Sequence, residues 1–234
     1  MTIHIKFDLP EETKSYHKSL RRALLFLVEE CQKRESRTDI SVLDVGCGRG
    51  EILSEIRSLG AHVEGVDMEE ECVLLSQQYA EVKRGNIYDL PDLYSDSEFD
   101  VVIASHLLEH LENPKHGIEM LKRISRKYLI LAVPNLAEFR NVSWFARTPG
   151  LVNRGHQVGW DPAHFNTFLT HACDLTILQW QPDRVFAFPI RFHGVVDKFG
   201  LLGAIYYVQD NWLTKLFPLQ SHSIITLCSM ENEL

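Results

Sequence analysis

Apolar runs alternate with helical patterns along this chain, and the alternation predicts a mostly parallel sheet covered by helices. The first apolar run, residues 40–45, is rich in β-branched residues, which is typical of a buried strand. A glycine-rich turn and a helical pattern follow it, as in the first strand–helix unit of a Rossmann-like sheet. Further strands are expected at 63–66, 81–84, 99–105, 128–133, 174–180 and 222–229.

Apolar residues recur at helical spacing between these strands. The pattern within 10–34 predicts one or two helices ahead of the first strand. Asp161 and Pro162 are residue types preferred at the N-cap and at the first helical position, so a helix should begin there. Other helices are expected at 51–59, 69–79 and 115–126.

The turn after the first strand carries three glycines at alternate positions, Gly46, Gly48 and Gly50. Glycines let the backbone turn tightly and let a ligand lie against it, and the following helix begins with free N–H groups. The spacing is G-x-G-x-G, whereas dinucleotide-binding loops read G-x-G-x-x-G. Asp44 precedes the loop, and its carboxylate would repel a pyrophosphate but attract a ligand that carries an ammonium and a sulfonium.

The stretch Asp44 to Gly50, DVGCGRG, resembles motif I of class I S-adenosylmethionine-dependent methyltransferases. Further similarity extends over most of the chain, toward the type 11 and 23 group with its glycan- or lipid-directed and MetW-like members. The resemblance implies a Rossmann-like seven-stranded α/β sheet with strand order 3-2-1-4-5-7-6, an antiparallel strand 7 and helices on both faces. It also implies S-adenosylmethionine as cofactor.

The resemblance assigns cofactor contacts to residues at the strand ends and in the N-terminal helix. Asp67 ends the second strand, about 20 residues beyond the glycine loop, where a carboxylate can accept both ribose hydroxyls; it could also cap the helix at 69–79. Asn86 and Ile87 match the positions that hold the adenine. Tyr16 could approach the cofactor or simply pack. The full set is Tyr16, Asp44, Gly46, Cys47, Gly48, Gly50, Asp67, Met68, Asn86, Ile87, Ala104 and Ser105.

Three histidines are the candidates for a catalytic base: His106, His110 and His156. The first two lie in H-L-L-E-H, which also fits the H-x-x-E-H metal pattern and would then place them on one helical face. That pattern needs a different fold and further ligands, so no metal is expected. Each histidine could instead be structural. A histidine is the side chain best suited to remove a hydroxyl proton near neutral pH.

The acceptor is expected to be an oxygen of a sugar, glycan or lipid-linked molecule, with a small metabolite as the alternative. Pro134-Asn135 lacks the D/N-P-P-Y/F signature of amine methylation, and 184–220 is an aromatic-rich insertion where a short turn would suffice. Two further alternatives stay open, a non-catalytic MetW-like partner protein that binds the cofactor and a dehydrogenase. The glycine spacing disfavours the dehydrogenase.

Composition narrows the partners and the compartment. The 234 residues suit a single domain, with 1–36 as a helical cover, 37–135 as the cofactor half and 136–234 as the acceptor half. A net charge of −8 argues against nucleic acid as a partner. The five cysteines show no C-x-x-C pair, and no signal peptide or long apolar run is present, which favours a cytoplasmic protein with at most peripheral membrane contact. A monomer and a homodimer are both open, because the sequence does not distinguish them.

Overall fold

The computed structural model describes residues 11–138, 153, 155–185, 208 and 212–230. For residues 11–17 it describes the backbone alone. The α-helices are α1 Glu11–Glu35, α2 Leu53–Ser58, α3 Glu70–Ser76, α4 Leu90–Leu93, α5 Pro114–Ile124, α7 Pro162–Thr167 and α10 Thr214–Leu216. Short 3₁₀ helices are η1 Ile87–Asp89, η2 Leu108–His110 and η5 Pro218–Gln220, and η3 Phe168–Ala172 is a π-helix. The strands are β1 Ser41–Val45, β2 His62–Asp67, β3 Glu81–Arg84, β4 Phe99–Ser105, β5 Ser125–Pro134, β6 Thr176–Trp180 and β7 Ser223–Ser229.

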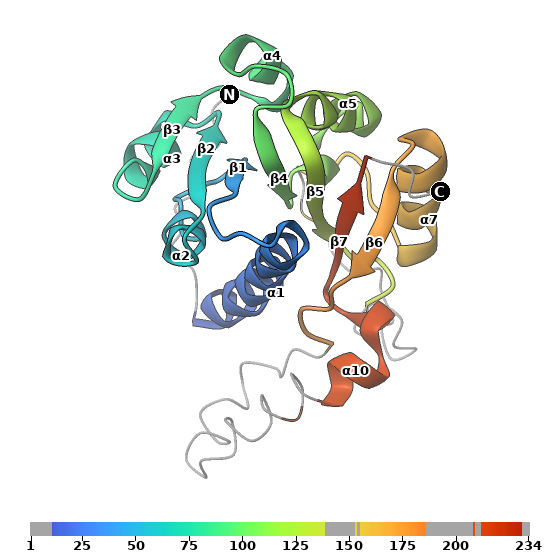
Figure 1. The fold of residues 1–234 in the computed structure, drawn as a ribbon. Coiled ribbons are helices and arrows are strands. Elements are labelled where there is room, and N and C mark those ends of the chain that lie inside the picture. The colour runs from blue at the N-terminus through green and yellow to red at the C-terminus, as the bar shows by residue number, and fades with distance from the viewer. Residues whose placement is uncertain (1–10, 139–152, 154, 186–207, 209–211, 231–234) are drawn as a thin grey trace.

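The seven strands form one sheet in the order β3-β2-β1-β4-β5-β7-β6, as predicted (Figure 1). The strands β1 to β5 are mutually parallel, and β7 runs antiparallel to both β5 and β6. Every predicted strand is present. The carboxyl ends of β1, β2 and β4 therefore meet at one edge, where Val45 pairs with Val66 on one side and Ala104 on the other.

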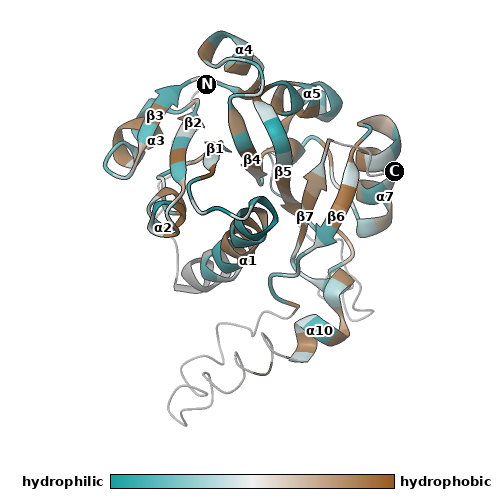
Figure 2. Ribbon diagram, in the orientation of Figure 1, coloured by the Kyte–Doolittle hydropathy of each residue, from teal (hydrophilic) through white to brown (hydrophobic). Residues whose placement is uncertain are grey.

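Successive residues of the central strands point to opposite faces, and each face has its own layer of helices. Val42 and Ile103 pack with the apolar residues of α1 and α2, whereas Leu43 and Val102 pack with those of α5 and α7. Figure 2 shows the hydrophobic residues along β4 and β7. This three-layer arrangement leaves the carboxyl edge of the parallel strands open to ligands.

The connection between β6 and β7 carries exposed apolar side chains at the same edge. Trp212 is 63% exposed, Leu216 65%, Phe217 52% and Leu219 51%. The carbonyl of Leu219 accepts a hydrogen bond from Asn135, directly after β5, so this connection lies at the carboxyl end of β5. Most of the predicted insertion, including Tyr206 and Tyr207, lies outside the described residues. No helix in the described part of the chain is long and apolar enough to cross a membrane.

Candidate active site

The glycine loop joins β1 to α2 and is fastened to the end of β2. Gly46, Gly48 and Gly50 have φ angles of +76°, +55° and +75°, in the left-handed region that favours glycine. The N–H groups of Gly46 and Cys47 donate to the Val66 carbonyl at 2.8 and 3.1 Å. The Gly48 N–H donates to Asp67 Oδ2 at 2.8 Å. The loop is thus held open by bonds to the neighbouring strand.

Gly48 and Gly50 face different surroundings, and this difference makes a matched pair of substitutions. A β-carbon at Gly50 would lie 2.7 Å from Ser76 Cβ, whereas one at Gly48 would meet no protein atom within 4 Å. Gly50→Ala should therefore lower the free energy of unfolding by roughly 2–4 kcal/mol, from left-handed strain plus overpacking. Gly48→Ala should remain folded but bind S-adenosylhomocysteine about tenfold or more weakly, because its methyl group fills the space left for the ligand.

Thermal unfolding and calorimetry separate the two effects. Equal ligand affinity for wild type and Gly48→Ala would show that the ligand does not lie against this loop.

Asp67 lies beside the loop at the end of β2 and is 8% exposed. Its Oδ1 accepts the Glu69 N–H at 2.9 Å, while its Oδ2 accepts the Gly48 N–H. The N-cap position of α3 is Glu69, so the alternative in which Asp67 itself occupies the N-cap is wrong. A carboxylate has about four acceptor sites, so two remain for the hydroxyls of a ribose.

Asp44 precedes the loop within β1 and is 4% exposed. Burial, with the nearby Asp67 carboxylate, raises the pKa of Asp44 to about 7. A cationic ligand favours the ionised carboxylate, so binding should release a proton around neutral pH.

Accordingly, the affinity for S-adenosylmethionine should fall by up to about tenfold per pH unit as the pH drops below about 7. The stability of the ligand-free protein depends on pH in the opposite direction. A raised acid pKa contributes stability at pH below about 4, and that stability is lost as the pH rises through about 7. Calorimetry in buffers of different ionisation enthalpy measures the proton release. The Asp44→Asn variant should show none of it, and an unchanged pH profile in that variant would rule out Asp44 as its source.

The other predicted cofactor contacts have unequal access to a ligand. Met68 is 62% exposed, and Ser105 is half-buried at the end of β4. Ala104 is fully buried and Cys47 is 8% exposed, so a ligand would meet mainly the backbone of these two residues.

Asn86 and Ile87 form the start of η1. The Asn86 Oδ1 accepts the Tyr88 N–H at 2.7 Å, and Asp89 Oδ2 accepts the Asn86 N–H at 2.9 Å, which closes a capping box. Ile87 is 3% exposed and belongs to the core. Tyr16 lies within α1, but its side chain is outside the described part of the chain.

The three predicted catalytic histidines converge at the end of β4, although they do not share a helix. His106 has a φ of +53°, and only Leu108–His110 forms a short 3₁₀ turn, so His106 and His110 do not lie on one helical face. The rings of His110 and His156 meet edge to face with centroids 4.9 Å apart. Left-handed backbone at a residue other than glycine stores strain and is concentrated at functional sites.

Glu109 lies among these histidines, and sequence reasoning gave it no role of its own. It is 1% exposed, and its Oε1 is 3.4 Å from His106 Nδ1. Burial raises the pKa of Glu109 to about 8. Burial and the neighbouring His110 lower the pKa of His156. The H-x-x-E-H pattern was the one sequence signal for this carboxylate.

Backbone and side-chain hydrogen bonds hold the segment of Glu109 and His110 against the segment at 155–158, which lies about 45 residues further along the chain. The Glu109 carbonyl accepts the N–H groups of Gln157 and Val158 at 2.7 and 3.3 Å. His110 Nδ1 lies 3.1 Å from the Gly155 carbonyl oxygen. The cluster also adjoins the glycine loop, because Leu107 Cδ1 lies 3.4 Å from a β-carbon built at Gly46.

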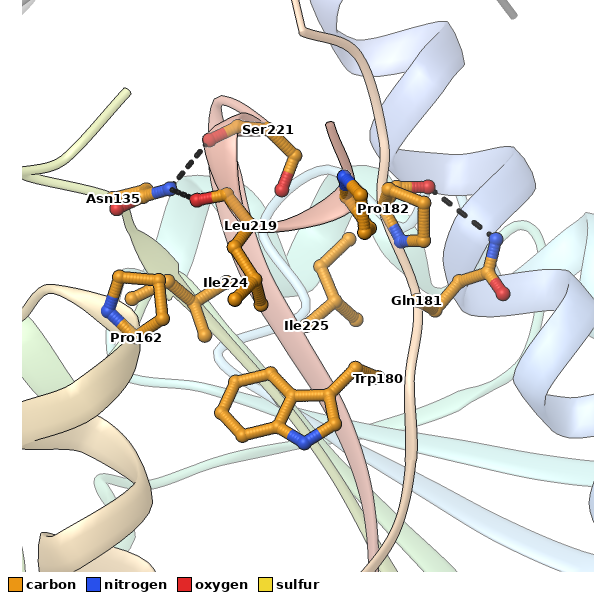
Figure 3. Close-up of a pocket in the computed structure, with 10 residues that line it drawn as sticks. Asn135, Pro162, Trp180, Gln181, Pro182, Leu219, Ser221, Ile224 and Ile225 are labelled. Carbon is orange, nitrogen blue, oxygen red and sulfur yellow. Dashed lines mark hydrogen bonds between the residues drawn. The ribbon is translucent and has the colours of Figure 1, made fainter. Parts of the chain in front are cut away.

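A small cavity and a larger open groove lie beyond β5 in the described part of the chain. One of about 10 Å³ is shown in Figure 3, where Asn135 Nδ2 donates to the carbonyls of Leu219 and Ser221 at 3.0 and 2.7 Å. It is too small for an acceptor, and Asn135, which is 3% exposed, is a packing residue. An open groove of about 880 Å³ is lined in part by Val158, Trp160 and Phe168. Through Val158 this groove adjoins Glu109.

Comparisons with known proteins agree with this geometry. A family model described as a methyltransferase domain matches residues 14–179. The ubiquinone biosynthesis O-methyltransferase of Glaesserella parasuis serovar 5 is 30% identical over 105 residues, which cover 41% of this chain and 44% of that protein. The protein of the same name from Hahella chejuensis is 30% identical over 130 residues, covering 53% of this chain and 52% of that one. The chain thus matches about half the length of these curated relatives.

Solved methyltransferase structures share the fold. Magnesium protoporphyrin IX methyltransferase from Synechocystis PCC 6803, with bound S-adenosylhomocysteine, has a TM-score of 0.63 at 15% identity and covers 99% of this chain and 90% of that chain. A SAM-dependent methyltransferase from Archaeoglobus fulgidus has a TM-score of 0.54 at 18% identity, over 88% of this chain and 94% of that chain. At these identities the similarity establishes the fold.

Proposed function

The chain belongs to the class I S-adenosylmethionine-dependent methyltransferases, and from this premise we propose that it methylates a hydroxyl oxygen of a small-molecule acceptor. The observation that carries the proposal is that Leu107, the residue next to His106, packs against Gly46 of the glycine loop, so the segment that carries the histidines adjoins the loop. An oxygen acceptor must lose a proton, and histidines next to the methyl donor can accept it.

In the proposed reaction, the lone pair of the acceptor oxygen forms a bond to the methyl carbon. The carbon–sulfur bond breaks in line, its electrons return to sulfur, and S-adenosylhomocysteine is released. The hydroxyl proton moves to a base, for which His106, His110 and His156 are the candidates. Because the sulfonium is already activated, the protein contributes mainly by placing donor and acceptor together.

Two observations support an acceptor with an apolar or aromatic body. The relatives named ubiquinone biosynthesis O-methyltransferases favour a small metabolite over a glycan. The exposed Trp212, Leu216 and Phe217 also lie near the carboxyl edge of the sheet, where they could meet the body or tail of such a molecule. A lipid-linked acceptor would make use of the same surface.

The test is methyl transfer from methyl-deuterated S-adenosylmethionine to a panel of phenols, with and without alkyl tails, and of sugars. A phenolic product heavier by one deuterated methyl group, together with S-adenosylhomocysteine, is expected. Labelled sugar without labelled phenol would overturn the proposed acceptor class. Cofactor binding without turnover on any compound would favour a non-catalytic partner protein.

A further inference from the structure

Three side chains beside the proposed acceptor position have the composition of a metal site. One ligand atom each from Glu109, His110 and His156 lies within 4.8 Å of the other two. Two imidazoles and a carboxylate are a common ligand set for zinc and other divalent transition metals. Ligand atoms in a tetrahedral zinc site are about 3.3 Å apart, so the two imidazoles would have to rotate inward to bind the ion.

The state of Glu109 provides an independent indication of a cation. Its carboxylate is 1% exposed, and neither oxygen accepts a hydrogen bond from the described residues. A buried carboxylate is costly unless it is paired or binds a metal. The one ion-pair contact that the described residues give this carboxylate is His106 Nδ1 at 3.4 Å, and an ion placed between Glu109 and the two other histidines would add direct coordination.

Contacts around His110 are those expected of a metal-binding histidine. A hydrogen bond from its Nδ1 to the Gly155 carbonyl, at 3.1 Å, would leave the Nε2 lone pair available for an ion. A β-carbon at Gly155 would lie 3.1 Å from the same nitrogen, so glycine permits this close approach. His106, with Nδ1 at 3.4 Å from Glu109 and Nε2 at 3.1 Å from Ser223 Oγ, could orient the carboxylate from behind.

We propose that Glu109, His110 and His156 bind one divalent transition-metal ion such as Zn²⁺, with an open position for the oxygen of the acceptor. This role rests on the proposed methyl transfer, and it replaces the sequence-based expectation of metal independence. The ion would lower the pKa of a coordinated hydroxyl. The proton would pass to solvent or to His106, and the oxygen lone pair would then attack the methyl carbon while the carbon–sulfur bond breaks.

Metal binding is measured on the tag-free full chain after treatment with a chelator, by calorimetry with Zn²⁺ and by the visible absorption of added Co²⁺. One ion per chain is expected. Since outer-shell changes alone cost 10–100-fold in affinity, Glu109→Gln and His156→Asn should each cost about 100-fold or more. His62→Asn is the matched control, because His62 begins β2 at the opposite edge of the sheet and should bind metal like the wild type.

Thermal unfolding shows whether each variant is folded, so that a lost metal site can be told from a misfolded protein. At 100 times its dissociation constant, Zn²⁺ should raise the Tm of wild type and His62→Asn by roughly 5–10 °C. It should leave Glu109→Gln unchanged, while the metal-free Tm of this variant equals or exceeds that of wild type. Equal zinc affinity in all variants, or no binding to wild type, would overturn the proposal.

The binding of S-adenosylhomocysteine to the metal-free protein separates this proposal from the function itself. If the cofactor binds and the methyl group is transferred with the metal removed, the metal site fails and the proposed function stands. If metal binds as expected but the cofactor does not, the proposed function fails instead.

Discussion

His110→Asn is expected to lower methyl-transfer turnover by about 10²- to 10⁴-fold while leaving the affinity for S-adenosylhomocysteine unchanged. His110 lies next to His156 and beside Glu109, and it forms none of the hydrogen bonds that hold the glycine loop. Whether it accepts the proton or holds a metal, its loss removes the means of activating the acceptor. Steady-state kinetics and calorimetry on the same preparation measure both quantities.

Variants of the neighbouring histidines sharpen this result. His156→Asn should lower turnover by a factor of the same order, whether His156 accepts the proton or binds a metal. His106→Asn should lose less if His106 only orients Glu109, and its pH–rate profile should then shift. Zinc content distinguishes a lost ligand from a lost base in each case. Near-normal turnover in all three variants would mean that catalysis uses alignment alone or that the base lies elsewhere.

Asp67→Ala is expected to weaken the binding of S-adenosylhomocysteine by on the order of tenfold to a hundredfold or more. Two charge-assisted hydrogen bonds to the ribose would be lost, at about 1.5 to 3 kcal/mol for a bond of this type. The variant also loses the acceptor for the Gly48 N–H, so the glycine loop should become less well ordered. Calorimetry measures the affinity.

Asp67→Asn serves as the conservative comparison, because one amide oxygen can still accept the Gly48 N–H while the charge is removed. Its affinity should lie between those of wild type and Asp67→Ala. Wild-type affinity in a folded Asp67→Ala variant would remove the ribose assignment.

The fold could be predicted because each strand is short, apolar and bounded by polar or glycine-rich turns. The run before Gly46 and the run that ends at Ser105 both became central strands of the sheet. Local chemistry also sufficed at Asp161, whose Oδ1 accepts the His164 N–H at 2.9 Å as an N-cap should. Signals of this kind depend only on neighbours in the sequence.

The histidine cluster could be predicted only in part, because it depends on contacts between distant segments. The pattern H-L-L-E-H drew attention to His106 and His110. It does not contain His156, which comes from a distant segment of the chain. The hydrogen bonds from Gln157 and Val158 to the Glu109 carbonyl bring His156 to the site, and nothing in the local sequence around residue 156 encodes them. The burial of Glu109 follows from the same packing, so its role became visible only in three dimensions.

Asn135 is a residue for which the sequence indicated a place near the acceptor but the structure shows a packing role. Its place after β5 indicated the acceptor side of the sheet, yet its side chain is directed inward and bonds to the turn before β7. Sequence position placed Asn135 correctly at the carboxyl end of β5, but it did not give the direction of the side chain.

Native mass spectrometry of the full chain with S-adenosylhomocysteine and NAD⁺ at equal concentration tests the cofactor assignment most directly. One S-adenosylhomocysteine per chain and no bound NAD⁺ is the predicted spectrum, because Asp44 and the G-x-G-x-G spacing favour a nucleoside that carries an ammonium group over one that carries a pyrophosphate. A chain that carries NAD⁺, or that binds neither ligand, would contradict the assignment of the glycine loop to S-adenosylmethionine.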